Sequence, residues 1–130
     1  MHIFYIFQDP FGVDSSKAGL TSSPAVRLGV YQNSYSARSH IAQFDFAFVG
    51  TKSAITKLEN HVKQHFEWDI ERDGRGFSEW IDHHTSEQVL HKVKEIVDSC
   101  HYKVELLPDE FLPVTVDNLD DIQNWLTSQS

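Results

Sequence analysis

The feature that most constrains the fold is a β-hairpin pattern at the start of the chain. Residues 3–7 form an apolar, β-prone run, and the segment Asp9-Pro10-Phe11-Gly12 supplies residue types that a turn requires. Residues 16–20 then return as a second strand-like run. We therefore expect the chain to begin with two antiparallel strands.

The middle of the chain predicts a helix, a strand and a second helix. Ser23-Pro24 is typical of a helix start, and this helix should end near residues 33–35. Phenylalanines at positions 44, 46 and 48 alternate with small or polar residues, which indicates a strand with one buried face that ends at Gly50. Thr51 or Ser53 should cap the next helix, whose apolar residues recur at helical spacing: Ala54, Ile55, Leu58, Val62 and Phe66.

The last third predicts two more helices and a short strand. Residues 67–76 are charged and glycine-punctuated, which favours a loop or an irregular strand. Thr85-Ser86-Glu87-Gln88 is a capping-box pattern that opens a helix. A strand over 102–107 follows, and Asp117 should cap a short final helix. The pattern predicts an α/β fold with a small antiparallel sheet, the hairpin plus a third strand, flanked by helices.

Composition limits the class of protein. A chain of 130 residues with 40% hydrophobic and 12% aromatic residues suffices for one domain with a real core. Cys100 is the only cysteine, which excludes an internal disulfide and favours a reducing cytoplasm. No run of eighteen apolar residues predicts a membrane span, and the apolar start lacks the basic leader of a signal peptide. We expect a cytoplasmic protein without a membrane partner.

The net charge of −8 argues against a generic nucleic-acid binder, but it is unevenly distributed. Residues 1–66 carry six basic and four acidic side chains, whereas residues 67–130 carry five basic and fifteen acidic ones. Phosphate attraction is screened over about 8–10 Å at ordinary salt, so a mildly positive face can act despite an acidic back. The first half is therefore where a phosphate-binding surface is expected.

Four short motifs in this first half recur in the order of a known nuclease superfamily. Ile3-Phe4-Tyr5 lies on the first strand and Lys17-Ala18-Gly19 on the second, while Arg27 lies on the first helix and Glu59 on the next. The chain thereby resembles the GIY-YIG nucleases, in the Lys-x-Gly branch common in phages and bacteria. The segment Phe77–Ile81 resembles the closing strand of that branch. The resemblance implies a β-β-α-β-α nuclease core over residues 1–82. Residues 83–130 have no counterpart in that family, and we expect them to form a C-terminal α/β, largely helical extension packed on the same domain.

The resemblance implies a divalent-metal-dependent endonuclease that hydrolyses DNA phosphodiester bonds, encoded by a phage or mobile element. Glu59 would hold Mg²⁺ or Mn²⁺, because hard ions with several retained waters suit a single carboxylate. Arg27 would donate hydrogen bonds to the scissile phosphate. Tyr5 would act as general base or orient water, with Lys17 lowering its pKa. Tyr31, one turn after Arg27, would lie near the phosphate or simply pack the helix.

Departures from the family pattern leave alternatives open. Ile3 replaces the opening glycine of the first motif, and the late asparagine of several members has no clear match. A catalytically inactive relative that binds nucleic acid, a nucleotide ligand or a host protein is therefore the second hypothesis. A plain α/β interaction protein is the third. DNA binding should be weak or of low specificity, and the C-terminal helix could serve a homodimer or a protein partner.

Histidines and the cysteine suggest further sites. His61 and His65 stand at i, i+4 on a helix, a spacing that can place two imidazoles on one metal ion, but the pattern favours partly exposed histidines beside a core face. Cys100 has His101 as its neighbour, but sequence neighbours rarely form a Cys–His pair. Gly74-Arg75-Gly76 could contact phosphate or form a plain turn.

Overall fold

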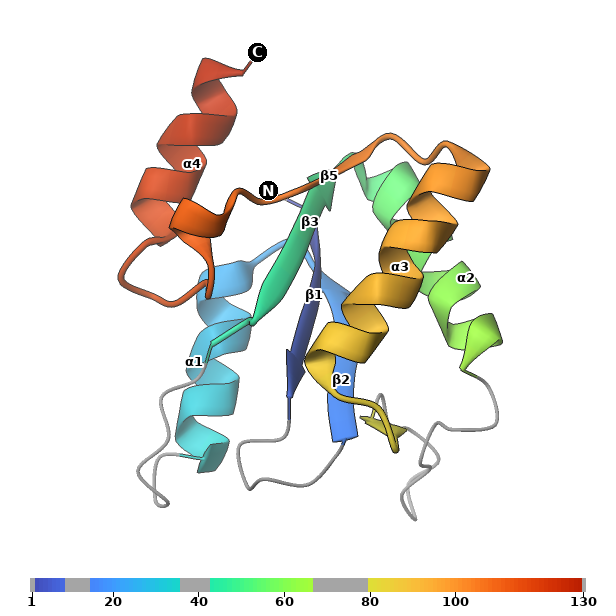
Figure 1. The fold of residues 1–130 in the computed structure, drawn as a ribbon. Helices are drawn as coiled ribbons and strands as arrows, with labels where there is room; N and C mark the ends of the chain where they lie inside the picture. The colour runs from blue at the N-terminus through green and yellow to red at the C-terminus, as the bar shows by residue number, and fades with distance from the viewer. Residues whose placement is uncertain (1, 9–14, 36–42, 67–79, 130) are drawn as a thin grey trace.

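The structure, a computed structural model, describes residues 2–8, 15–35, 43–66 and 80–129 (Figure 1). The predictions for residues 67–76, with Gly74-Arg75-Gly76, and for the start of the segment Phe77–Ile81 lie outside these ranges. Within the described part of the chain, no helix combines the length and apolar character needed to cross a membrane.

In the described part of the chain five strands form one antiparallel sheet, and the predicted N-terminal hairpin is confirmed as its centre. The strands are β1 (His2–Gln8), β2 (Ser15–Thr21), β3 (Phe46–Gly50), β4 (Trp80–Asp82) and β5 (Val104–Leu106). They lie in the order β4-β2-β1-β3-β5, with every neighbouring pair antiparallel. The chain is thus an α/β protein with an antiparallel sheet, as the sequence predicted.

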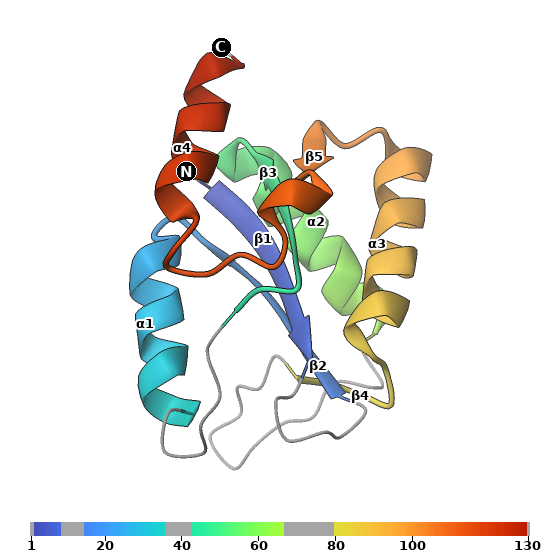
Figure 2. The ribbon, with the colours of Figure 1, turned by 60° about the vertical axis from the view of Figure 1, so that its left-hand side comes forward.

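Four α-helices cover the two faces of this sheet. They are α1 (Pro24–Tyr35), α2 (Lys52–His65), α3 (Ser86–Cys100) and α4 (Leu119–Ser128), and a short 3₁₀ helix, η2 (Asp109–Phe111), precedes α4. Figures 1 and 2 show α2 and α3 on one side of the strands and α1 and α4 on the other. Residues after position 82 therefore supply an edge strand and a helix for each face.

Each face of the sheet has its own apolar core, because successive side chains of a strand point to opposite faces. Phe4 and Ile6 of β1 pack with the apolar stripes of α2 and α3. Ile3, Tyr5 and Phe7 pack on the other face with α1, α4 and the segment that precedes α4. In β1, therefore, the odd-numbered residues face α1 and α4, whereas the even-numbered residues face α2 and α3.

The predicted caps of α2 and α3 are confirmed. The Thr51 hydroxyl accepts a hydrogen bond from the Ala54 N–H at 3.2 Å. Thr85 forms a full capping box: its hydroxyl accepts from the Gln88 N–H at 3.2 Å, and the Gln88 side chain accepts from the Thr85 N–H at 2.9 Å. Both helices thus begin where the threonine satisfies a free N–H of the first turn.

Three predicted boundaries were wrong. The strand predicted over 102–107 is shorter, because β5 covers only Val104–Leu106. Asn118, not Asp117, occupies the N-cap position of α4, because its side chain holds the preceding loop: it accepts from the Thr115 N–H and donates to the Phe111 and Pro113 carbonyls. The third strand begins at Phe46 and not at Phe44. Phe44 instead forms an isolated bridge with Val114, with N···O distances of 2.9 and 2.8 Å.

Candidate functional site

Tyr5 lies in the interior of the α1/α4 face. Its side chain is 1% exposed. Its ring stacks on Phe44, with centroids 4.4 Å apart and planes 13° from parallel, and it also contacts the Phe7 ring at 6.1 Å. Aromatic pairs at these separations stabilise a core beyond their buried area. The ring of the predicted general base is therefore part of an aromatic stack.

Lys17 and Arg27 belong to the same side of the molecule as Tyr5. In the hairpin register Tyr5 is opposite Gly19 and Phe7 is opposite Lys17, so Lys17 points to the face that Tyr5 occupies. Lys17 is half-buried, whereas Arg27 is exposed on α1. Tyr31 belongs to α1 as well, but its side chain lies outside the described part of the structure.

Glu59 lies on the opposite side of the sheet. It belongs to α2, whose buried residues Ile55, Leu58 and Val62 pack on Phe4 and Ile6. Its side chain is 14% exposed, and its Oε1 lies 3.4 Å from the Nζ of Lys63, one turn along the helix. The structure therefore brings Tyr5 and Lys17 to one face of the sheet and places Glu59 across the sheet from them.

The implied Mg²⁺ can be tested against the surroundings of Glu59. Mg²⁺ is usually held by one or two carboxylates and substrate phosphates. Glu59 pairs with the Lys63 ammonium, which competes with a cation for the same carboxylate oxygen. Among the described residues, no group of three or more His, Cys, Asp or Glu side chains could hold a metal ion. The Lys63 ammonium beside Glu59 therefore does not favour a preformed Mg²⁺ site at this carboxylate.

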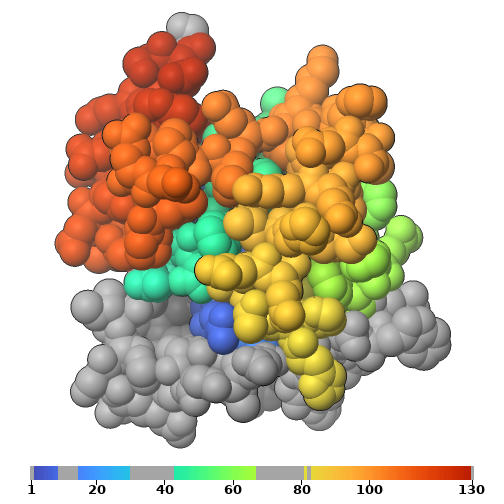
Figure 3. Space-filling model, in the orientation of Figure 1, coloured from blue at the N-terminus to red at the C-terminus, as the bar shows by residue number. Residues whose placement is uncertain are grey.

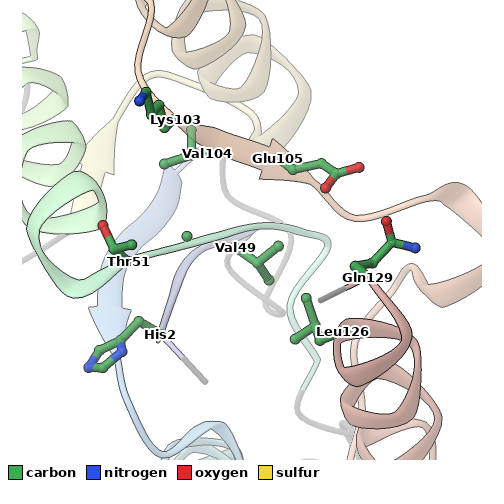
Figure 4. Close-up of a pocket in the computed structure, with 9 residues that line it drawn as sticks. His2, Val49, Thr51, Lys103, Val104, Glu105, Leu126 and Gln129 are labelled. Atoms are coloured by element: carbon green, nitrogen blue, oxygen red, sulfur yellow. The ribbon is translucent and has the colours of Figure 1, made fainter.

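A groove of about 680 Å³ lies at the other end of the sheet from the hairpin turn. Figure 4 shows it between the ends of β3 and β5 and the last turn of α4, with Val49, Val104 and Leu126 as its apolar lining and His2, Lys103, Glu105 and Gln129 at its polar positions. None of Tyr5, Lys17, Arg27 and Glu59 lines it. The groove is thus separate from the predicted site.

Helix α2 carries three of the basic residues of the first half of the chain. It carries the lysines at positions 52, 57 and 63, and we call these three residues the cationic face of α2. Glu59 is the only acidic residue of this helix, and it is paired with Lys63. The polar neighbours Asn60 and Gln64 are exposed. Glu59 therefore neutralises part of the charge that this surface could offer to an anion.

The opposite side of the molecule carries the acidic excess. From Val104 to the C-terminus the chain has no lysine or arginine, and its acidic residues are Glu105, Asp109, Glu110, Asp117, Asp120 and Asp121. In Figure 3 this segment (orange to red) occupies the upper left of the view, while α2 (green) and α3 (yellow to orange) form the right-hand side. The acidic residues of α4, Asp120 and Asp121, therefore lie on the face of the sheet opposite the lysines of α2.

A histidine, a cysteine and a tyrosine meet where α2 passes the end of α3. His61 Nδ1 lies 3.1 Å from the Tyr102 hydroxyl and 3.7 Å from Cys100 Sγ. The sequence suggested the pairs His61–His65 and Cys100–His101. In the structure His61 contacts Cys100. No local pattern could indicate a contact between residues that are 39 positions apart.

Neighbouring His65 lies on the same stretch of α2. Its ring is 4.8 Å from the Phe66 ring, and the Phe66 ring is 4.9 Å from that of His84. Partial desolvation lowers the pKa of His65 below 6.5, and the nearby charges of Lys92, His61 and His84 add to this, while Glu95 opposes it. Desolvation is the main cause of this lowered pKa.

Comparison with known proteins adds no relative, because no family model, no curated protein and no solved structure matches the chain.

Proposed function

We propose that this chain is a DNA-binding protein of GIY-YIG-like design that contacts backbone phosphates without hydrolysing them. The observation that carries the proposal is the combination on α2 of a cationic outward surface with a glutamate that lies across the sheet from Tyr5 and Lys17. Phosphodiester hydrolysis requires these groups to act together on one phosphate, within hydrogen-bond reach of it. Glu59 belongs to a helix on one face of the sheet and Tyr5 to the core of the other face, so the sheet stands between them.

Charge complementarity supports phosphates as the ligand. Binding to a nucleic-acid backbone comes mainly from lysine and arginine side chains that displace condensed counterions. The cationic face of α2 supplies three lysines on one helix, and the acidic C-terminal segment would repel phosphates from the other side. The molecule should therefore bind DNA in one orientation, with α2 toward the backbone and α4 away from it.

The binding test is fluorescence anisotropy with a labelled DNA duplex of mixed sequence. We expect affinity to fall steeply as salt rises from about 50 to about 200 mM, with little dependence on base sequence. Lys57→Ala should reduce the slope of log affinity against log salt by about 1. Lys94→Ala is the matched control. Lys94 is also an exposed lysine, but it belongs to α3, where it lines a groove with Phe46 and Leu90. Equal effects of the two variants would contradict a specific role for α2.

The cleavage test uses supercoiled plasmid with Mg²⁺ and, separately, with Mn²⁺. We expect no nicking above the protein-free control. Nicking by the wild type that is lost in Glu59→Gln would overturn the non-catalytic part of the proposal and leave the binding part intact. A DNA affinity that does not change with salt would overturn the binding part of the proposal and leave the non-catalytic part intact.

A metal-dependent endonuclease is the second candidate function, since one observation favours it. Tyr5 and Lys17 share the sheet face that α1 covers, and α1 carries Arg27. In that case the hydroxyl of Tyr5 would be needed for cleavage, and Tyr5→Phe would abolish nicking while leaving DNA affinity unchanged.

A further inference from the structure

The cluster of His61, Cys100 and Tyr102 presents three different donor atoms from three segments of the chain. His61 belongs to α2, Cys100 is the last residue of α3, and Tyr102 lies between α3 and β5. The helices are fixed relative to one another, because Val62 of α2 and Ile96 of α3 belong to the same core. The Tyr102 ring packs against that core while its hydroxyl reaches His61. The donors are thus held by packed elements.

The donor separations match those around a tetrahedral zinc ion. With Zn–S near 2.3 Å and Zn–N near 2.05 Å, a tetrahedral angle places the sulfur and nitrogen about 3.6 Å apart. The separation between Cys100 Sγ and His61 Nδ1 is 3.7 Å. A phenolic oxygen as third ligand would lie about 3.3 Å from the nitrogen, and Tyr102 Oη is 3.1 Å from it. The two separations that involve His61 Nδ1 are therefore compatible with coordination of one ion.

The end of α3 provides a second reason for a cation at this position. The last carbonyls of a helix carry partial negative charge, which favours a cation and disfavours a free thiolate. Cys100 is the last residue of α3 and is exposed, so an ion can reach it from solvent.

We propose that His61 Nδ1 and Cys100 Sγ form a binding site for a soft or borderline divalent cation of the zinc class, with the Tyr102 hydroxyl as third ligand or as a hydrogen-bond partner. On binding, the Cys100 thiol releases its proton to solvent and the thiolate coordinates the ion, while His61 coordinates as neutral imidazole. Water occupies the remaining positions. No electron is transferred, and the site does not depend on DNA binding.

The experiment is a titration of the whole reduced protein with Co²⁺, a spectroscopic substitute for Zn²⁺, followed by absorption spectroscopy. We expect a near-ultraviolet charge-transfer band of cobalt bonded to thiolate, with visible bands of tetrahedral intensity, and loss of both when Zn²⁺ is added. Binding should release about one proton per ion at neutral pH, measurable in weakly buffered solution. Absence of the charge-transfer band at saturating Co²⁺ would overturn the proposal.

Variants distinguish a site built by both His61 of α2 and Cys100 of α3 from a cysteine that binds metal alone. Cys100→Ser should abolish the charge-transfer band, and His61→Gln should weaken Co²⁺ binding by at least about tenfold, the effect that loss of even an outer-shell partner has. His101→Gln is the matched control, because this neighbouring histidine caps α3 and should leave the titration unchanged. Circular dichroism checks that each variant is folded. A band unaltered in folded His61→Gln would show that Cys100 binds metal without α2 and would refute the site.

Discussion

The two faces of the sheet differ in how they combine packing with surface chemistry. The α2/α3 face has a mainly aliphatic helix-on-sheet core, two threonine-capped helices and a surface rich in lysine and histidine. The α1/α4 face holds an aromatic stack of Tyr5, Phe7 and Phe44, and its C-terminal segment is acidic. The sheet thus separates residues, such as Tyr5 and Glu59, that the sequence motifs had grouped into one site.

The largest expected effect tests the aromatic stack. Phe44→Ala should lower the free energy of unfolding by about 3–5 kcal/mol, because the ring is fully buried against Tyr5 and its loss leaves a cavity. Urea denaturation measures the change. Val26→Ala on α1 is the control, since Val26 is 68% exposed and should change stability by less than about 0.5 kcal/mol. A loss below about 1 kcal/mol for Phe44→Ala would mean that the α1/α4 core is not packed as described.

A pair of glycines tests how closely the edge strand β5 approaches the sheet. A Cβ at Gly50 would lie 3.0 Å from Val104 Cγ1 and 3.1 Å from the Lys103 carbonyl oxygen. Gly50→Ala should therefore destabilise the protein by about 1–3 kcal/mol through overpacking. Gly29→Ala in α1 meets nothing within 4 Å and should stabilise by about 0.4–1 kcal/mol. Thermal and urea unfolding of both variants would show opposite signs, and equal signs would refute the β3–β5 contact.

The capping box of α3 sets a smaller effect on the other face. Thr85→Ala removes the acceptor for the Gln88 N–H and should cost about 1 kcal/mol. Thr85→Ser keeps the hydroxyl and should restore most of the stability, so the difference between the two variants measures the cap. Hydrogen exchange should show faster exchange in the first turn of α3 for the alanine variant only.

The smallest effect concerns pH. The pKa of His65 is lowered in the folded protein, so the unfolded chain binds more protons between that pKa and 6.5. Stability should therefore fall as the pH decreases through 6.5 toward the lowered pKa, and should be fully present above 6.5. The groups around His65 are Lys92, His61, His84 and Glu95. His65→Gln should remove this part of the pH dependence of the melting temperature, whereas His101→Gln should not. The effect is modest because His65 is exposed.

Local sequence signals determined most of the elements of this protein. The hairpin, the three long helices and the caps at Thr51 and Thr85 follow from side-chain periodicity and from hydroxyls placed before a helix. The cap of α4 was missed by one residue, because Asn118 is fixed by hydrogen bonds to a loop that no local pattern specifies.

Only the tertiary structure decided which residues meet. The sequence placed Tyr5, Lys17, Arg27 and Glu59 on suitable elements, but the sheet face that a helix covers depends on the path of the chain between elements. That path puts α2 on the face opposite Tyr5 and brings Cys100 to His61. The periodicity of apolar residues shows which side of a helix or strand is buried. Long-range packing determines which other elements that side contacts.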